Sequence, residues 1–224
     1  MKGNLLVIDS KTSEMRSLLR NEAFQCMTKF LKDSAHSIQV GKLAVQLFDK
    51  LSLYHGYGEE ERFYLECGAY LHDIGLAVGD KKHHKHSLRL ILDGKLPSFN
   101  QRDKRIIANI ARYHRRSSPK PNHHEFLLLS PTDREIVNKM AGILRVADAL
   151  DRSRRLEIDE LTCIVQNGVC QIYIDTPLSI EGEIKALDKK KDLFNKVFGL
   201  DVRLTAVGET REMATSEASP GSSI

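Results

Sequence analysis

The chain has 224 residues, of which 41% are hydrophobic and 29% charged, so it has a globular composition and can bury a core. Its net charge of +4 does not by itself indicate a nucleic-acid-binding protein, and no apolar run approaches the roughly 20 residues that a membrane-spanning helix needs. The apolar stretch at residues 5–8 is too short for the core of a signal peptide. We therefore expect a soluble, cytoplasmic protein with no membrane partner.

Apolar residues at helical spacing predict a series of helices over the first two thirds of the chain. Three acidic residues from Glu59 to Glu61 suit the first turn of one helix, and Gly75 ends it. Thr132 and Glu135 form a capping box that opens another. The helices are expected at 21–31, from Asp33-Ser34 to about 51, 59–74, 87–92, 102–114 and 132–150, with a His-rich loop at 79–85.

After about residue 157 the pattern changes to strands. Two apolar runs flank Asn167-Gly168, a dipeptide typical of a two-residue β-hairpin turn. A helix over 181–198 and a strand over 201–205 follow. The predicted fold class is mainly α, a helical bundle followed by a small α+β C-terminal unit. Its divisions are an N-terminal extension (1–20), the helical domain (21–156), the α+β unit (157–207) and a disordered tail (208–224).

Polar side chains fall on the apolar faces of four of these helices. His36 precedes Val40 by four residues, His72 follows Ala69 by three, and both His114 and Asp148 follow apolar residues by four and seven. One buried histidine is usually a hydrogen-bonded core residue, but a buried aspartate without a partner is costly. A shared cation would satisfy all of these groups, and imidazole with carboxylate suits Mn, Fe, Zn or Ni. Asp73, next to His72 at a helix end, can turn toward the same point.

These residues follow the H…HD…D pattern of the HD-domain superfamily of metal-dependent phosphohydrolases, which the chain resembles. Its closer resemblance is to the HD-like C-terminal region of the exopolyphosphatase/guanosine pentaphosphate phosphatase family. The matching segments are DSAHSIQVGKLAVQLFDKL, LHDIG, HHKHSLRLIL, IARYHRRSSPKP, LRVADALDRSR and KKKDLFNKVFGLDVRL, over about residues 25–205.

The resemblance implies an HD-type helical bundle that holds one or two divalent metal ions (Mn, Fe, Mg, Ni or Zn). The implied ligands are His36, His72, Asp73 and Asp148. Members with extra histidines hold two metals, and His114 with one of His83, His84 and His86 matches the extra positions. We favour His84 and His86, because the next helix is expected to begin there; a solvated loop is an equal alternative. In the family the phosphatase site lies in actin-like domains that precede this region, so that activity is not carried over.

We expect hydrolysis of a small phosphorylated, nucleotide-like substrate by metal-activated water. Asp73 would ligate or bridge, and developing negative charge would need cationic partners. The catalytic candidates are Asp73, Lys85 and Arg115. The expected substrate-binding residues are Lys85, Arg115, Arg116 and Arg152, although each of these cations could be a solvated surface charge. Asp151 could support a histidine ligand or carry a proton, but a capping or salt-bridging role competes.

Two other functions compete with hydrolysis. The first is a non-catalytic regulatory module that binds a metal or a nucleotide. The second is a nucleic-acid-binding protein, disfavoured because there is no recognisable motif and few aromatic residues to stack on bases. Its basic residues would be Lys81, Lys82, Lys85, Arg112, Arg115, Arg116 and Lys120. Substrate identity is open, as is the oligomeric state, for which a homodimer is one option.

Overall fold

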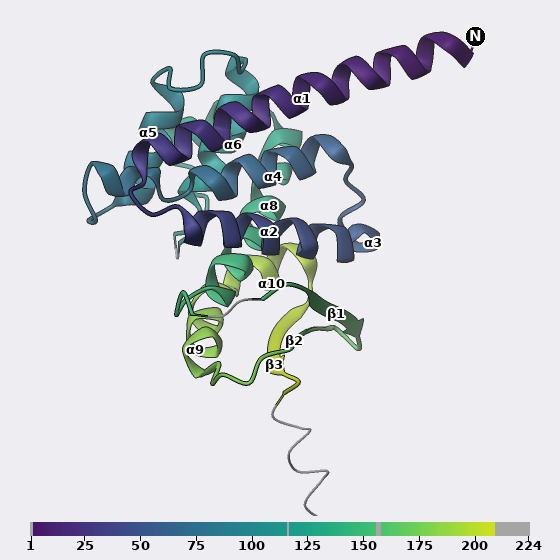
Figure 1. Ribbon diagram of the computed structural model, residues 1–224, viewed down its shortest axis with the longest axis vertical. Coiled ribbons are helices and arrows are strands. Elements are labelled where there is room, and N and C mark those ends of the chain that lie inside the picture. Colours follow the sequence, from purple (N-terminus) through teal and green to yellow (C-terminus); the bar gives the residue numbers. More distant parts are fainter. Residues whose placement is uncertain (1, 116, 156–157, 209–224) are drawn as a thin grey trace, which may run out of the picture.

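The computed structural model describes residues 2–115, 117–155 and 158–208, with side chains from residue 12 onwards. It has a helical body and a small α+β unit, as the sequence predicts (Figure 1). The body consists of α1 (Lys2–Phe30), α2 (Ala35–Lys50), α3 (Ser52–His55), α4 (Glu59–Leu71), the 3-10 helix η1 (Ile74–Ala77), α5 (His83–Leu92), α6 (Gln101–Arg112), α7 (His124–Leu127) and α8 (Pro131–Leu150). The α+β unit consists of β1 (Leu161–Gln166), β2 (Val169–Ile174), α9 (Glu181–Lys190), α10 (Asp192–Phe198) and β3 (Asp201–Ala206).

Helix α8 is the centre of the molecule. Every residue from Met140 to Asp151 is buried, because α2, α4 and α6 of the body and α9 and α10 of the α+β unit all pack against this helix. Its first turn differs from the prediction: Ser130 is the N-cap, accepting a 3.0 Å hydrogen bond from the Asp133 N–H. Pro131 occupies the first helical turn, where its missing N–H costs no hydrogen bond.

The first helix is longer than the sequence pattern indicated. The expected boundary at residue 20 falls inside α1, which runs along the body and extends beyond it at its N-terminal end (Figure 1). Its buried residues Leu19, Ala23, Cys26 and Met27 repeat at helical spacing. Arg20 forms a 2.6 Å ion pair with Glu66 of α4, which attaches the helix to the body at its edge.

The α+β unit contains the predicted hairpin. Strands β1 and β2 are antiparallel, and Asn167 and Gly168 both have positive φ, 50° and 75°, as this turn requires. Strand β3 pairs with β2 in parallel after a helical crossover. The expected helix over 181–198 is divided into α9 and α10, so that the Phe194 backbone packs on α8, where a Cβ at Gly142 would lie 3.3 Å from Phe194 Cα. The predicted disordered tail lies, apart from Gly208, outside the described residues.

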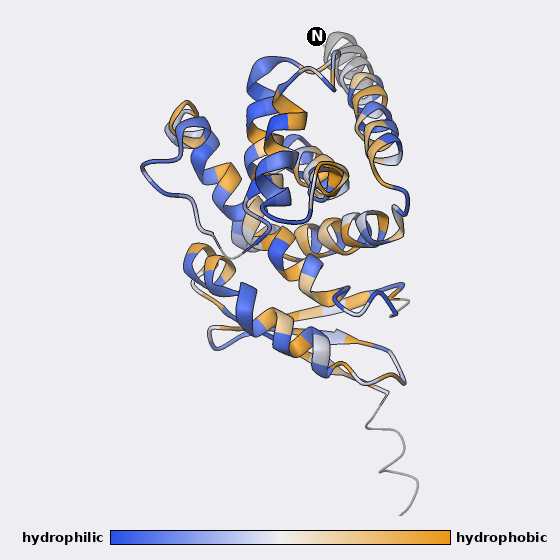
Figure 2. Ribbon diagram, turned by 90° about the vertical axis from the view of Figure 1, so that its left-hand side faces the viewer, coloured by the Kyte–Doolittle hydropathy of each residue, from blue (hydrophilic) through white to orange (hydrophobic). Residues whose placement is uncertain are grey.

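A buried arginine connects the two parts of the molecule. Arg145 of α8 is 0% exposed; its Nε donates to the Tyr113 carbonyl at 2.7 Å and its Nη1 to Asp192 Oδ1 at 2.6 Å. The end of α6 and the start of α10 are thus held by one side chain. Figure 2 shows that the helices carry hydrophobic and hydrophilic residues on different sides, as amphipathic elements around a shared core do. Within the described residues, no helix combines the length and apolar character that crossing a bilayer requires.

Candidate metal centre

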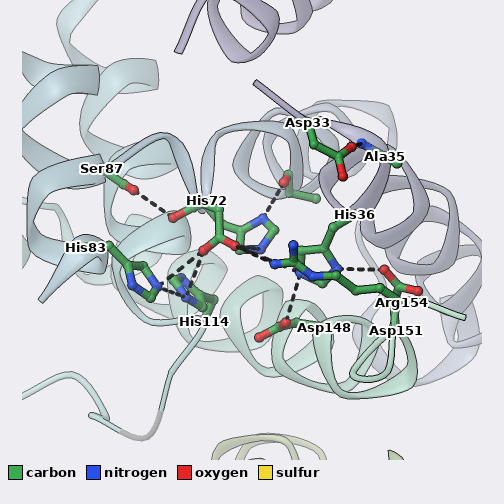
Figure 3. A network of polar contacts seen from close by, with 12 residues as sticks. Asp33, Ala35, His36, His72, His83, Ser87, His114, Asp148, Asp151 and Arg154 are labelled. Atoms are coloured by element: carbon green, nitrogen blue, oxygen red, sulfur yellow. Dashed lines mark hydrogen bonds and ion pairs between the residues drawn. The ribbon is translucent and has the colours of Figure 1, made fainter. Parts of the chain in front are cut away.

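Imidazole and carboxylate groups from five separate segments converge beside α8. His36 lies in the first turn of α2, and His72 and Asp73 lie between α4 and η1. His114 follows the end of α6 by two residues, and Asp148 lies in the last turn of α8. His83, the first residue of α5, completes the group. In Figure 3 the rings of His36, His72, His83 and His114 approach one another from different parts of the backbone.

Gly75 allows α5 to lie close to the His72-Asp73 pair. Its N–H donates to Ser87 Oγ at 2.9 Å. The Ser87 hydroxyl in turn donates to the His72 carbonyl at 2.7 Å (Figure 3). A Cβ at residue 75 would lie 2.1 Å from the His83 carbonyl oxygen and 2.5 Å from Ser87 N, both backbone atoms. Only glycine therefore permits this packing, which places His83 at the centre.

Asp73 is the shared member of the cluster. Its Oδ1 lies 3.2 Å from His83 Nε2 and 3.7 Å from His114 Nε2. Its Oδ2 lies 3.5 Å from His72 Nε2 and 4.0 Å from His36 Nε2. The possible ligand atoms form two sets, and within each set all the atoms lie within 4.8 Å of one another. The first set is His36, His72 and Asp73, and the second is Asp73, His83 and His114. One carboxylate thus joins two sites that could each hold a cation.

The opposite ring nitrogen of each histidine has its own acceptor. The Nδ1 atoms of His72 and His114 donate to the carbonyls of Ala69 and Ala111, both at 2.6 Å. His83 Nδ1 donates to the Asp80 carbonyl at 3.0 Å, and His36 Nδ1 lies 2.6 Å from Asp151 Oδ2. Because a carbonyl can only accept, Nδ1 carries the proton in His72, His83 and His114. In neutral rings each Nε2 therefore presents a lone pair to the centre, the tautomer that metal ligation requires.

Two features of the cluster indicate that a cation fits there. His83 Nε2 and His114 Nε2 lie 3.3 Å apart, so neutral rings would point their lone pairs at each other. The buried His72 Nε2 has no hydrogen-bond partner among the described atoms. Orphaned nitrogens beside a carboxylate are costly without a partner, and a metal ion would satisfy them together.

The carboxylates of the cluster are ionised. Burial opposes this, but the neighbouring histidines, His72 first, hold the pKa of Asp73 well below its ordinary value. Burial also opposes ionisation of Asp148, whose pKa is held well below its ordinary value by Lys190 and then by His36. For His36, burial lowers the pKa, but hydrogen bonds to Asp148 and Asp151 outweigh it and raise the pKa to about 9. The site thus strongly favours positive charge at its centre.

The cluster opens into a cleft of about 770 Å³ between the helical body and α9. Cationic side chains surround the opening: Arg115, Arg152, Arg154, Lys185, Lys189 and Lys190. Arg154 Nη2 lies 4.0 Å from Asp73 Oδ2 (Figure 3), and Lys190 Nζ forms an ion pair with Asp148. An anionic ligand would therefore meet positive charge on several sides.

The structure brings together most of the predicted ligands. His36 Nε2 lies 3.4 Å from Asp148 Oδ1 and 4.0 Å from Asp73 Oδ2, so residues 36, 73 and 148 lie close together. Asp151, proposed as a supporting residue, contacts His36 directly. Arg115 and Arg152 line the cleft. Arg116, predicted to bind substrate, lies outside the described residues.

The structure does not support the preference for His84 and His86 over His83 as metal ligands. The helix begins at His83 and not near Ser87. His83 and Ser87 are buried, whereas His84 and His86 are only partly buried and belong to neither set of ligand atoms. His84 still borders the cleft. Lys85 is exposed and lines a different pocket with Arg89 and Arg112, which separates it from the cluster.

The sequence interpretation also missed several residues that line the cleft, among them Arg154, Lys189 and Lys190. Arg154 follows Asp151 by three residues and has positive φ, 57°, a conformation that no pattern predicted. Lys189 and Lys190 belong to the α+β unit, 41 and 42 residues beyond Asp148. The sequence shows that this segment is rich in lysine, but it does not show where the segment lies. The packing of α9 against α8 brings these lysines to the site.

Comparisons with known proteins support the sequence resemblance. Residues 20–181 match the family model of the Ppx/GppA phosphatase, domain III. The chain is similar to the guanosine-5'-triphosphate,3'-diphosphate pyrophosphatase of Vibrio vulnificus (strain YJ016), with 28% identity over 72% of this chain and 33% of the relative. The protein of the same name from Vibrio campbellii (strain ATCC BAA-1116) is 28% identical over 62% of this chain and 27% of the relative. The chain thus matches about a third or less of the length of these relatives.

Proposed function

Because this chain belongs to the Ppx/GppA phosphatase domain III family, we propose that it is a metal-dependent phosphohydrolase of the HD type, with its active site in the helical body. The observation that carries the proposal is the sharing of Asp73 by two sets of imidazole ligands at the base of a cationic cleft. The relatives named as pyrophosphatases act on a phosphorylated nucleotide. A small nucleotide-like phosphoester or phosphoanhydride is therefore the substrate class that we propose.

Two divalent ions would be held by different sides of Asp73. One would be bound by His36, His72, Asp73 and Asp148, and the other by Asp73, His83 and His114. Four imidazoles with carboxylates favour Mn, Fe, Ni or Zn over an all-oxygen site. When bound, such ions polarise a phosphoryl oxygen and lower the pKa of water.

The side chains around the cluster would orient the substrate. Arg115 and Arg152 border the cleft, where guanidinium groups can bind phosphoryl oxygens in pairs of hydrogen bonds. Arg154 Nη2 lies 4.0 Å from Asp73 Oδ2, so this guanidinium group also borders the cluster. Asp151 keeps the His36 ring oriented through Nδ1, and such outer partners commonly tune a metal ligand. Together they would neutralise the charge that develops on the phosphoryl group.

One observation favours a second function, a non-catalytic regulatory module. Lys190 forms an ion pair with Asp148, so an ammonium group already neutralises one of the four metal-ligand candidates of the first site. A protein that uses the cleft only to bind a nucleotide or a structural metal could retain that ion pair. In a hydrolase, metal binding would have to compete with it.

The decisive experiment combines metal content with turnover. The metal-stripped protein would be reloaded with Mn(II), Fe(II), Ni(II) or Zn(II), and bound metal counted per chain. Each form would then be assayed with p-nitrophenyl phosphate, bis(p-nitrophenyl) phosphate and a guanosine polyphosphate. We expect no turnover by the stripped protein and turnover with at least one metal. If the protein binds metal stoichiometrically but hydrolyses none of these substrates, the result would refute the proposed hydrolase and favour the regulatory module.

A further inference from the structure

One face of α9 forms the wall of the cleft opposite the imidazole–carboxylate cluster. Its cleft-lining residues are Gly182, Lys185, Ala186, Lys189 and Lys190, at spacings of three, four, seven and eight residues from the first. These spacings describe a single side of an α-helix. The acidic residues of the helix, Glu181, Glu183 and Asp188, do not line the cleft. The helix therefore presents three lysines and two small residues, and no acidic residue, to the site.

The three lysines of this face are in different situations. Lys190 is partly buried and forms an ion pair with Asp148, which holds that carboxylate near His36. Lys185 is exposed and pairs with Glu181 on its own helix at 3.1 Å. Lys189 is exposed, and no acidic partner is found for it in the part of the chain that the structure describes. Lys189 can therefore bind an anion without breaking an existing ion pair.

The small residues of the face leave room between α9 and the cluster. A Cβ built at Gly182 would meet no atom within 4 Å, and Ala186 adds only a methyl group. The cleft volume of about 770 Å³ lies within the range of sites that hold small organic ligands. Large side chains at 182 and 186 would have occupied this space.

We propose that this face of α9 is the substrate-phosphate-binding wall of the site, with Lys189 as its anion-binding residue and Lys190 as the residue that positions Asp148. The inference rests on the proposed function and extends it to a second part of the molecule. The family model matches residues 20–181 and ends where α9 begins, so the wall comes from residues outside the matched region. The α+β unit is then part of the site.

The test uses inorganic pyrophosphate as a phosphate probe. It would be titrated calorimetrically into the metal-stripped chain of 224 residues at low and moderate salt. Lys189→Gln should weaken binding about tenfold, as expected for the loss of one charge-assisted hydrogen bond. The matched control is Lys196→Gln on α10, an exposed lysine outside the cleft, which should bind like the wild type. Absence of wild-type binding, or equal binding by Lys189→Gln and the wild type, would overturn the proposal.

Substitution of Lys190 should affect a second quantity, the affinity of the protein for metal. Lys190→Gln should alter metal affinity as well as pyrophosphate affinity, because it releases Asp148, whereas Lys189→Gln should leave metal affinity unchanged. Thermal unfolding of each variant would verify that it folds. Indistinguishable metal affinities for Lys190→Gln and wild type would refute its positioning role. Pyrophosphate binding does not require turnover, so a protein that binds by this pattern and hydrolyses nothing would disprove only the proposed function.

Discussion

The two walls of the cleft hold their functional side chains in different ways. On the helical-body wall the imidazoles of His72 and His114 are at most 2% exposed, and each is tethered by its Nδ1 to a backbone carbonyl. On the α9 wall Lys185 and Lys189 are exposed. Fixed ligands suit an ion with strict distances, and long mobile cations suit a substrate that must enter and leave. The difference indicates which residues should control metal content and which should control substrate affinity.

The largest effect is expected at the shared carboxylate. Asp73→Ala removes an oxygen from each set of ligands, so we expect both ions to be lost and turnover to fall on the order of 1000-fold or more. Metal analysis and steady-state kinetics would measure both. Asp175→Ala is the matched control, since Asp175 is exposed and does not line the cleft. Full metal content in Asp73→Ala would contradict the arrangement.

A methyl group at residue 75 should disturb the packing of α5 against the helical body and so destabilise the protein. Gly75→Ala places a Cβ against the backbone of α5, and we expect unfolding free energy to fall by about 2–3 kcal/mol. Chemical denaturation would measure the loss. Gly79→Ala, where a Cβ meets nothing within 4 Å, should lie within about 0.5 kcal/mol of wild type. Equal stability of the two variants would mean that α5 does not approach residue 75 so closely.

A pair of histidine substitutions separates the two ion sites. His83→Gln removes a ligand from the second set only, so bound metal should fall from two ions per chain to one. Affinity for the second ion should drop at least about 100-fold, the upper end of the cost of losing an outer-shell partner. His86→Gln is the control: His86 belongs to neither set of ligand atoms, so this variant should retain both ions. Loss of metal in His86→Gln with retention in His83→Gln would reverse the assignment.

The smallest effect concerns the cations of the body. Arg115→Gln should raise KM about tenfold with little change in metal content, because Arg115 borders the cleft and can bind a phosphoryl oxygen. Lys85→Gln should leave KM unchanged, since Lys85 lines a separate pocket. Steady-state kinetics at two salt concentrations would compare them. A larger effect from Lys85 would place substrate on the outer side of α5.

The sequence by itself determined the helical body, the hairpin at Asn167-Gly168 and the placement of His36, His72 and Asp148 on apolar helix faces. These features depend on local rules: hydrophobic periodicity, turn chemistry, and the cost of a polar group on an apolar face. Such rules act over one or two helical turns and are therefore readable in the chain.

Only the tertiary structure decided that His83 faces the cluster and that α9 closes the cleft. The start of α5 depends on close packing against Gly75 and on the hydrogen bonds of Ser87, neither of which leaves a periodic pattern. Lys190 meets Asp148 because contacts such as that of Arg145 with Asp192 dock the α+β unit against α8. Helix starts and docking depend on contacts between distant segments, whose sum is not encoded in any one segment.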